Sequence, residues 1–152
     1  MRIAIGSDHA GFSLKKSLAK WLLDRGMEVH DVGPHHMDPE DDYPDFARAV
    51  AEAVLNGSGD AGIVICSTGI GSCIAANKVT GIRAALCHDV LSARRSRQHN
   101  DANVLCLGAD IIGPALAQEV VSAWIESSFA GDERHRRRLA KVAGIEAPGA
   151  SP

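Results

Sequence analysis

A cysteine followed by a turn of hydroxyl and glycine residues is the most chemically suggestive part of this 152-residue sequence. Cys66 ends an apolar run and leads into Ser67-Thr68-Gly69-Ile70-Gly71. In such a turn successive backbone N–H groups converge on an anion, and a helix that follows adds positive potential. A thiolate is favoured there, so Cys66 could act as a base or nucleophile, with Thr68 donating or relaying a proton. The pattern predicts a phosphate site or an oxyanion hole, unless Cys66 is only a buried packing residue.

Two further stretches combine acid–base and hydrogen-bonding side chains at the ends of predicted elements. Asp8 and His9 follow the first predicted strand between glycines, which would let a ligand approach the backbone closely. Asp8 could equally cap the helix that follows. His99 and Asn100 lie in a segment (96–103) that has more donors and acceptors than a connector requires, and histidine exchanges protons near pH 7. The alternative is a plain solvated turn.

A basic segment near the end of the chain offers a site for an anion. Arg134 and Arg138 are four residues apart, so on a helix they share a face and could grip one dianion. The alternative is a solvated face or a patch for an acidic partner. Nucleic acid is not an expected partner, because no aromatic or second basic segment accompanies these arginines. The acidic loop 35–45 lacks the alternation of an EF-hand, so we expect no metal there.

The composition limits the class of protein. Hydrophobic residues make up 45% of the chain and charged residues 23%, which excludes a disordered chain or a coiled coil. The net charge of −3 argues against a protein that coats nucleic acid. The four cysteines form no CxxC pair, and Cys87 and Cys106 are expected to be small buried side chains in a reducing compartment. The sequence has no signal-like or 18-residue apolar segment, so we expect a soluble, cytoplasmic protein without a membrane role.

Strand-like and helix-like segments alternate along the chain. The predicted strands are 3–5, 28–32, 62–66, 83–87 and 104–107. The predicted helices are 12–25, one opened by Pro44 and ended by Asn56-Gly57, 72–78, 90–99, 114–129 and 132–143. Apolar residues at helical spacing mark their buried faces: Leu14, Leu18, Trp21 and Leu22, then Phe46, Val50 and Val54, then Leu116, Val120 and Trp124.

This alternation predicts an α/β fold. We expect a three-layer, flavodoxin- or Rossmann-like domain over residues 1–147, with a five-stranded parallel sheet and helices on both faces, and a frayed tail at 148–152. In such sheets the ligand lies outside the carboxyl ends of the strands, where the winding direction reverses. The candidate residues that follow strands should therefore gather at that edge.

Six motifs together resemble the type B ribose-5-phosphate isomerase family, which includes galactose-6-phosphate isomerase subunits and allose-6-phosphate isomerases. The resemblance extends from residue 3 to about residue 145. The motifs are SDHAGF at 7–12, DYPD at 42–45, CSTGIG at 66–71, IAANKVTGIRAA at 74–85, SRQHNDANVL at 96–105 and ERHRRR at 133–138.

The resemblance implies a homodimer or dimer of dimers with shared active sites, interconverting aldose and ketose phosphates without a metal or other cofactor. It implies that Cys66 moves the proton between C1 and C2 and that Thr68 relays protons. The backbone amides that would hold the enediolate are those of Ser67, Gly69, Ile70 and Gly71. His99 and Asp8 would assist opening of the furanose ring. The binding residues would be His9, Arg134 and Arg138 for the phosphate, and Tyr43 and Asn100 for the sugar.

Two departures bear on the substrate. Some members of the family carry a glutamate at the position of Ser72 and lack the cysteine, so this chain resembles the branch that uses a thiol base. Many members that act on ribose phosphate carry a phosphate-binding arginine where this chain has Asp110. The leading interpretation is a ribose 5-phosphate isomerase. The alternatives are the same chemistry on erythrulose 4-phosphate, allose 6-phosphate or galactose 6-phosphate, or a phosphosugar-binding module without activity.

Overall fold

A single sheet of five parallel strands forms the centre of the molecule, in the order β2-β1-β3-β5-β4. The computed structural model describes residues 1–146. The strands are β1 (Arg2–Ser7), β2 (Glu28–Asp31), β3 (Ala61–Cys66), β4 (Ala84–Leu86) and β5 (Val104–Gly108).

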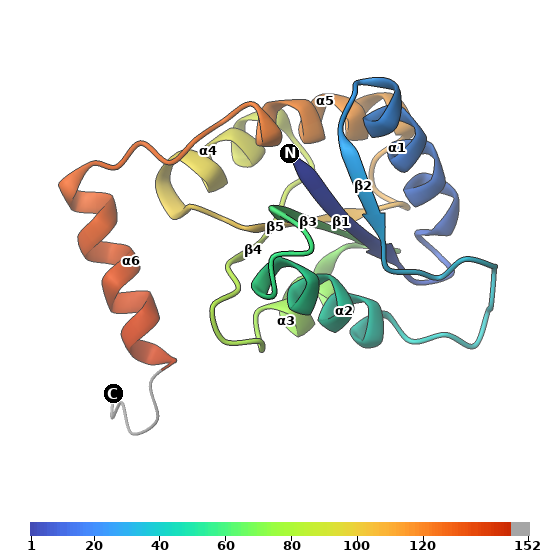
Figure 1. Ribbon diagram of the computed structural model, residues 1–152, viewed down its shortest axis with the longest axis horizontal. Coiled ribbons are helices and arrows are strands. Elements are labelled where there is room, and N and C mark those ends of the chain that lie inside the picture. Colours follow the sequence, from blue (N-terminus) through green and yellow to red (C-terminus); the bar gives the residue numbers. More distant parts are fainter. Residues whose placement is uncertain (147–152) are drawn as a thin grey trace.

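Helices cover both faces of the sheet (Figure 1). One face carries α1 (Phe12–Asp24), α4 (Val90–Asn100) and α5 (Pro114–Ile125), and the other carries α2 (Tyr43–Leu55) and α3 (Ile70–Ala76). A sixth helix, α6 (Glu133–Ile145), stands apart from both layers beyond the end of α4. The predicted three-layer α/β fold with a parallel sheet is confirmed.

The core divides into two layers because side chains alternate across each strand. In β3 all six residues are buried. Ile63 and Ile65 pack toward α1 and α5, whereas Val64 packs toward α2. Gly62 allows α2 to approach the sheet, since a Cβ there would lie 2.5 Å from Val50 Cγ1. A central strand that is apolar on both faces was expected from the sequence, and the structure confirms it.

Most of the predicted buried helix faces are confirmed, but one residue that was predicted to be buried is exposed. Leu14, Leu18 and Leu22 are buried on α1, but Leu116 of α5 is 39% exposed. Residues four apart rotate by about 40° around a helix, so a residue eight positions before Trp124 has left the buried face. Ala117 faces the core instead.

Several boundaries differ from the prediction for local reasons. The helix α5 ends at Ile125 rather than at residue 129, and the chain then runs past α4, where Ala130 N–H donates to Gln98 O at 3.0 Å. The strand β4 is shorter than 83–87, because Arg83 N–H donates to the Asn103 side chain at 2.7 Å. The helix α3 begins at Ile70, two residues before the predicted start.

Cys87 and Cys106 are buried free thiols, as predicted. Within residues 1–146, no helix is long and apolar enough to cross a membrane. The predicted frayed tail at 148–152 lies outside the described residues, and a single domain over 1–147 stays a prediction.

Candidate functional site

The winding of the sheet reverses between β1 and β3, because β2 lies on one side of β1 and β5 lies on the far side of β3. Loops leaving the carboxyl ends of these two strands diverge and open a crevice. Ser7 pairs with Ile65 in register, and Asp8 N–H donates to Ile65 O at 3.2 Å. The structure therefore brings Asp8 next to Cys66 at this edge, as the sequence predicted.

The Cys66 side chain turns back toward the backbone of its own turn. It is only 3% exposed, and Cys66 Sγ accepts a hydrogen bond from Gly69 N–H at 3.1 Å. Thr68 Oγ1 accepts one from Ile70 N–H at 3.3 Å. The carbonyls of Cys66 and Ser67 accept from the Ala109 and Asp110 N–H groups at 2.9 Å each. The loop between β5 and α5 thus holds the turn in place by donating hydrogen bonds to the carbonyl groups of Cys66 and Ser67.

Several backbone N–H groups of the turn are left free to bind an anion. Among the described residues, the N–H groups of Ser67 and Thr68 have no protein hydrogen-bond partner. The first bond within α3 runs from Cys73 N–H to Gly69 O, so Gly71 N–H precedes the hydrogen-bonded part of the helix. Such convergent amides can stabilise negative charge that develops on an oxygen beside the Cys66 sulfur.

Two positions of the turn pack so closely against their neighbours that only glycine fits. Gly69 has a φ of +77°, which favours glycine, and a Cβ there would lie 2.9 Å from the carbonyl carbon of Leu107. A Cβ on Gly71 would lie 2.7 Å from Tyr43 Cζ. The ring of Tyr43, at the start of α2, therefore lies against the turn and forms one wall beside it.

Asp8 and His9 join this cluster through different partners. Asp8 is 6% exposed and its Oδ1 accepts from Gly11 N–H at 3.0 Å, which closes the turn before α1 and does not cap an N–H group within that helix. Burial raises the pKa of Asp8, against the opposing effect of the Gly11 hydrogen bond. His9 Nδ1 lies 2.8 Å from Asp41 Oδ1, and this hydrogen bond raises the pKa of His9.

Asp41 and His88 are partners that the sequence did not reveal. Asp41 also accepts from His9 N–H at 2.8 Å, although 32 residues separate the two in the chain. It comes from the acidic loop 35–45, in which we expected no metal from the sequence. Across residues 1–146, no group of three or more His, Cys, Asp or Glu side chains is placed to hold a metal ion. His88 Nε2 accepts from Gly108 N–H at 3.0 Å and so supports the end of β5 beside Cys66.

A second group of candidate residues gathers where α4 ends and α6 begins. His99 lines an open cavity of about 690 Å³ with Arg95, His135 and the two predicted arginines, Arg134 and Arg138. The ring of His99 stacks on that of His135, with centroids 4.4 Å apart and planes 11° apart. Partial burial, followed by the neighbouring positive groups, lowers the pKa of His99. Arg134 and Arg138 are exposed and form no ion pair with any described residue.

The two groups of candidate residues lie at opposite ends of the strands, one at the carboxyl ends and the other near the amino ends. Cys66 is the last residue of β3, whereas Asn100 ends α4 and precedes Asn103, whose carbonyl accepts from Gly62 N–H near the start of that strand. A six-residue strand spans about 20 Å. In Figure 1, α6 extends from the end of α4 away from the other helices. One chain therefore does not bring His99, Asn100, Arg134 and Arg138 to Cys66.

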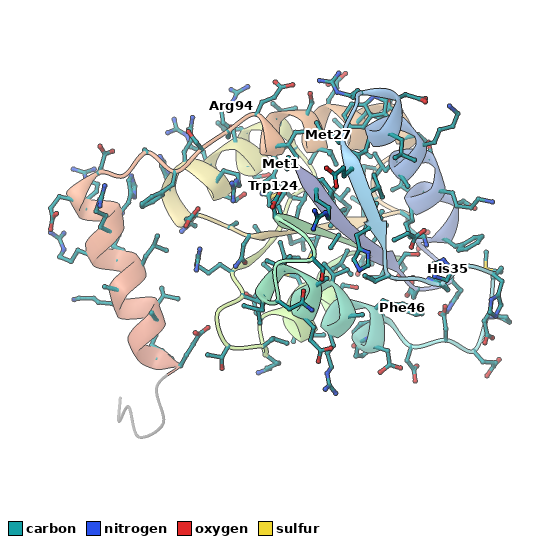
Figure 2. The ribbon with its side chains drawn as sticks, viewed as in Figure 1. Met1, Met27, His35, Phe46, Arg94 and Trp124 are labelled. Atoms are coloured by element: carbon teal, nitrogen blue, oxygen red, sulfur yellow. The ribbon has the colours of Figure 1, made fainter. Side chains whose placement is uncertain are left out.

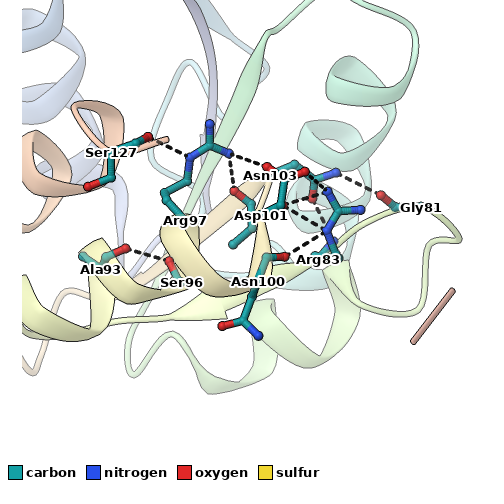
Figure 3. Close-up of polar contacts among 10 residues, drawn as sticks. Gly81, Arg83, Ala93, Ser96, Arg97, Asn100, Asp101, Asn103 and Ser127 are labelled. Atoms are coloured by element: carbon teal, nitrogen blue, oxygen red, sulfur yellow. Dashed lines mark hydrogen bonds and ion pairs between the residues drawn. The ribbon is translucent and has the colours of Figure 1, made fainter. Parts of the chain in front are cut away.

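A polar network fixes the end of α4 that carries His99 and Asn100 (Figure 3). Arg83 Nε donates to Asn100 O at 3.1 Å, and Arg83 Nη2 donates to Asp101 O at 2.7 Å and to Asp101 Oδ2 at 3.0 Å. Asp101 ends the helix at a φ of +45°. Arg97 Nη1 donates to Ala102 O at 2.6 Å. Both arginines lie within the sequence motifs, at 74–85 and 96–105, but the sequence did not reveal that they hold this end of α4.

Asp110 lies beside the Cys66 turn. Its N–H binds Ser67 O, and its exposed side chain borders a cavity of about 270 Å³ that Ala10 and Ser13 also line. A carboxylate at this place would repel a phosphate dianion but could accept hydrogen bonds from hydroxyl groups.

The chain is similar to known proteins over most of its length. The sequence model of a family described as Ribose/Galactose Isomerase matches residues 3–142. Ribose-5-phosphate isomerase B of Escherichia coli is 46% identical over 145 residues, covering 95% of this chain and 96% of that protein. D-erythrulose-4-phosphate isomerase of Pectobacterium atrosepticum is also 46% identical, over 131 residues and 86% of each protein.

Solved structures agree with the fold over nearly its whole length. Ribose-5-phosphate isomerase B of Clostridium thermocellum superposes with a TM-score of 0.93 at 52% identity, covering 96% of this chain and 97% of that one. The Mycoplasma genitalium enzyme, solved with bound ribulose-5-phosphate, has a TM-score of 0.90 at 43% identity and covers 95% of each chain.

Proposed function

This chain belongs to the Ribose/Galactose Isomerase family and is a sugar-phosphate isomerase, and from that premise we propose that it interconverts ribose 5-phosphate and ribulose 5-phosphate. The relative of E. coli carries that substrate in its name, and the M. genitalium structure holds ribulose-5-phosphate. The observation that carries the proposal is the buried Cys66 sulfur within a turn of backbone donors.

The chemistry requires a base beside an oxyanion site. A proton next to a carbonyl is removed from one carbon and returned to its neighbour, and the intermediate enediolate holds negative charge on oxygen. The Cys66 thiolate takes the proton, and Thr68 relays protons between the oxygens. The backbone N–H groups of Ser67, Gly69, Ile70 and Gly71 stabilise the enediolate, and those of Gly69 and Ile70 exchange their present acceptors, Cys66 Sγ and Thr68 Oγ1, for the substrate oxygen. Losing one comparable donor costs other enzymes about 2.7–4 kcal/mol.

The remaining residues bind the sugar or open its ring. Arg134 and Arg138 carry guanidinium groups that pair with no carboxylate in the described part of the chain and suit a phosphate dianion, together with His9. His99 and Asp8 assist opening of the furanose ring. Tyr43, which lies over Gly71, and Asn100 contact the sugar hydroxyls.

Two copies of the chain are needed to complete this site. Within one chain the end of α4 lies about a strand length from Cys66, and Arg134 and Arg138 line the same cavity as His99 at that end. Exposed apolar side chains around the Cys66 turn, namely Ile70, Ile74, Leu91 and Ile111, are 53–61% exposed and suit coverage by a second copy. In an isologous pair, the end of α4 and α6 of each copy would reach the Cys66 turn of the other, so two shared sites form together.

A pair of cysteine variants tests the base. Cys66→Ala should lower kcat by about 10²–10⁴-fold while leaving binding of ribose 5-phosphate intact. Cys73→Ala is the matched control, because Cys73 is half-buried and a hydrogen bond with Cys106 lowers its pKa to about 7. Turnover by isotope exchange and binding by calorimetry are measured on both. If Cys73→Ala lost turnover and Cys66→Ala kept it, the assignment of the base would be wrong.

A second candidate substrate has four carbons. Asp110 beside the turn disfavours a phosphate there, and the P. atrosepticum relative is named for D-erythrulose 4-phosphate. Comparing kcat/KM for ribose 5-phosphate, erythrulose 4-phosphate, allose 6-phosphate and galactose 6-phosphate separates these possibilities. A ligand-induced thermal shift without any isomerised product would instead indicate a binding module.

A further inference from the structure

One contact of His99 lies outside the roles assigned above. Arg95 Nη1 lies 2.9 Å from His99 Nε2, one helical turn earlier on α4. A guanidinium has donors only, so Nε2 must be the acceptor and carry a lone pair. A neutral His99 then bears its proton on Nδ1, which makes no hydrogen bond to any described residue.

The surroundings favour this neutral form. From α4, Arg95 faces the imidazole; from α6 and the residue before it, the charged or titratable neighbours are Asp132, Glu133, Arg134, His135 and Arg138. His135 is 7% exposed and stacks on the His99 ring, which holds the ring plane. The positive charges outnumber the carboxylates, so a second proton on His99 is disfavoured.

We propose that Arg95 is a positioning residue that locks His99 as the Nδ1–H tautomer, so that His99 presents a neutral hydrogen-bond donor to the ring oxygen of the sugar phosphate. The inference rests on the proposed function of the site. Ring opening moves the proton of the anomeric hydroxyl to the ring oxygen as the C1–O bond breaks. A donor at that oxygen stabilises the charge that develops on it, and the Arg95 contact polarises the donor further.

The substrate itself offers a control. Ribose 5-phosphate closes into a furanose through O4, whereas in erythrulose 4-phosphate that oxygen is esterified and the chain stays open. Loss of the Nδ1–H donor should therefore slow only the five-carbon reaction. Without Arg95, the Nε2–H tautomer becomes populated and points a lone pair at the ring oxygen.

The experiment uses the full chain with Arg95→Met, Arg95→Lys and the neighbouring Arg94→Met. Arg94 lies on the outward side of α4 (Figure 2), makes no hydrogen bond or ion pair with any described residue, and controls for lost charge. Arg95→Met should lower kcat/KM for ribose 5-phosphate by about tenfold and leave that for erythrulose 4-phosphate within about twofold. Arg95→Lys, which keeps a cationic donor, should recover most of the loss, and Arg94→Met should match the wild type.

Nitrogen-15 NMR of the His99 ring identifies its tautomer independently of any measurement of activity. The wild type above the pKa of His99 should show a protonated Nδ1 and a bare Nε2, and Arg95→Met should shift toward a protonated Nε2. Protonated Nε2 in the wild type, or an equal loss on both substrates, would overturn the role of Arg95. If the wild type isomerised neither sugar, the proposed function would fail, whereas the NMR spectrum would still decide the tautomer.

Discussion

At the scale of single residues, the two histidines proposed to act on the substrate have opposite environments. His9 donates to the carboxylate of Asp41, which raises the pKa of His9. Partial burial, and after it the neighbouring positive groups, lower the pKa of His99. A cationic His9 suits a phosphate, and a neutral His99 suits a sugar oxygen. The neighbours of each ring thus divide the work between two identical side-chain types.

Replacing Asp41 tests this division. Because the folded pKa of His9 is raised, the pair stabilises the fold below the unfolded pKa of about 6.5, and this stabilisation is lost as pH rises through the folded value. Asp41→Asn should lower the pKa of His9, so that KM for the sugar phosphate begins to rise at a lower pH. NMR titration of the His9 ring and KM against pH measure the two effects. Asp42→Asn, in the same loop, is the control, and an unchanged His9 titration in Asp41→Asn would contradict the prediction.

At the scale of elements, the sequence revealed those segments whose pattern is local. The apolar run before Cys66 predicted a central strand, and the glycines after it predicted the turn, because both depend on neighbours in the chain. Leu116 was placed wrongly, since its exposure depends on how α5 is rotated against the sheet. The sequence did not reveal three residues that support the proposed site. Asp41 and His88 act on partners that only the tertiary structure brings close, and Arg95 reaches His99 only through the rotamers on α4.

Arg83 couples two elements, and its loss should loosen one of them. It ties β4 to the last residues of α4 through Asn100 and Asp101. Hydrogen bonds from a charged group contribute about 1.5–3 kcal/mol, so Arg83→Met should lower the free energy of unfolding by about that amount. Amide hydrogen exchange should accelerate over residues 99–103. The exposed ion pair of Arg48 with Glu52 provides the control, since Arg48→Met should cost no more than about 0.5 kcal/mol. Equal effects of the two variants would show that Arg83 does not hold the end of α4.

At the scale of the whole molecule, the two groups of residues are separated within one chain, which is the reason for proposing that two copies share each site. The proposed base and amide donors lie where β1 and β3 end, and Arg134 and Arg138, which form no ion pair with any residue in 1–146, lie on α6, which stands away from its own sheet. A helix that leaves its own domain can complete the site of a neighbouring copy. The order of the motifs in the sequence placed all these residues in one family pattern. Only the topology shows that they lie at opposite ends of the strands.

Mixing two inactive variants tests the shared site. One variant is Cys66→Ala, and the other carries Arg134→Ala with Arg138→Ala. If each site takes its base from one chain and its arginines from the other, a mixed dimer contains one site with both defects and one intact site. Equal amounts that are unfolded and refolded together form mixed dimers in half of the molecules, so about a quarter of wild-type kcat should return. The variants mixed without refolding control for carry-over. Sites completed within one chain would leave every site defective, and the refolded mixture would then be as inactive as either variant alone.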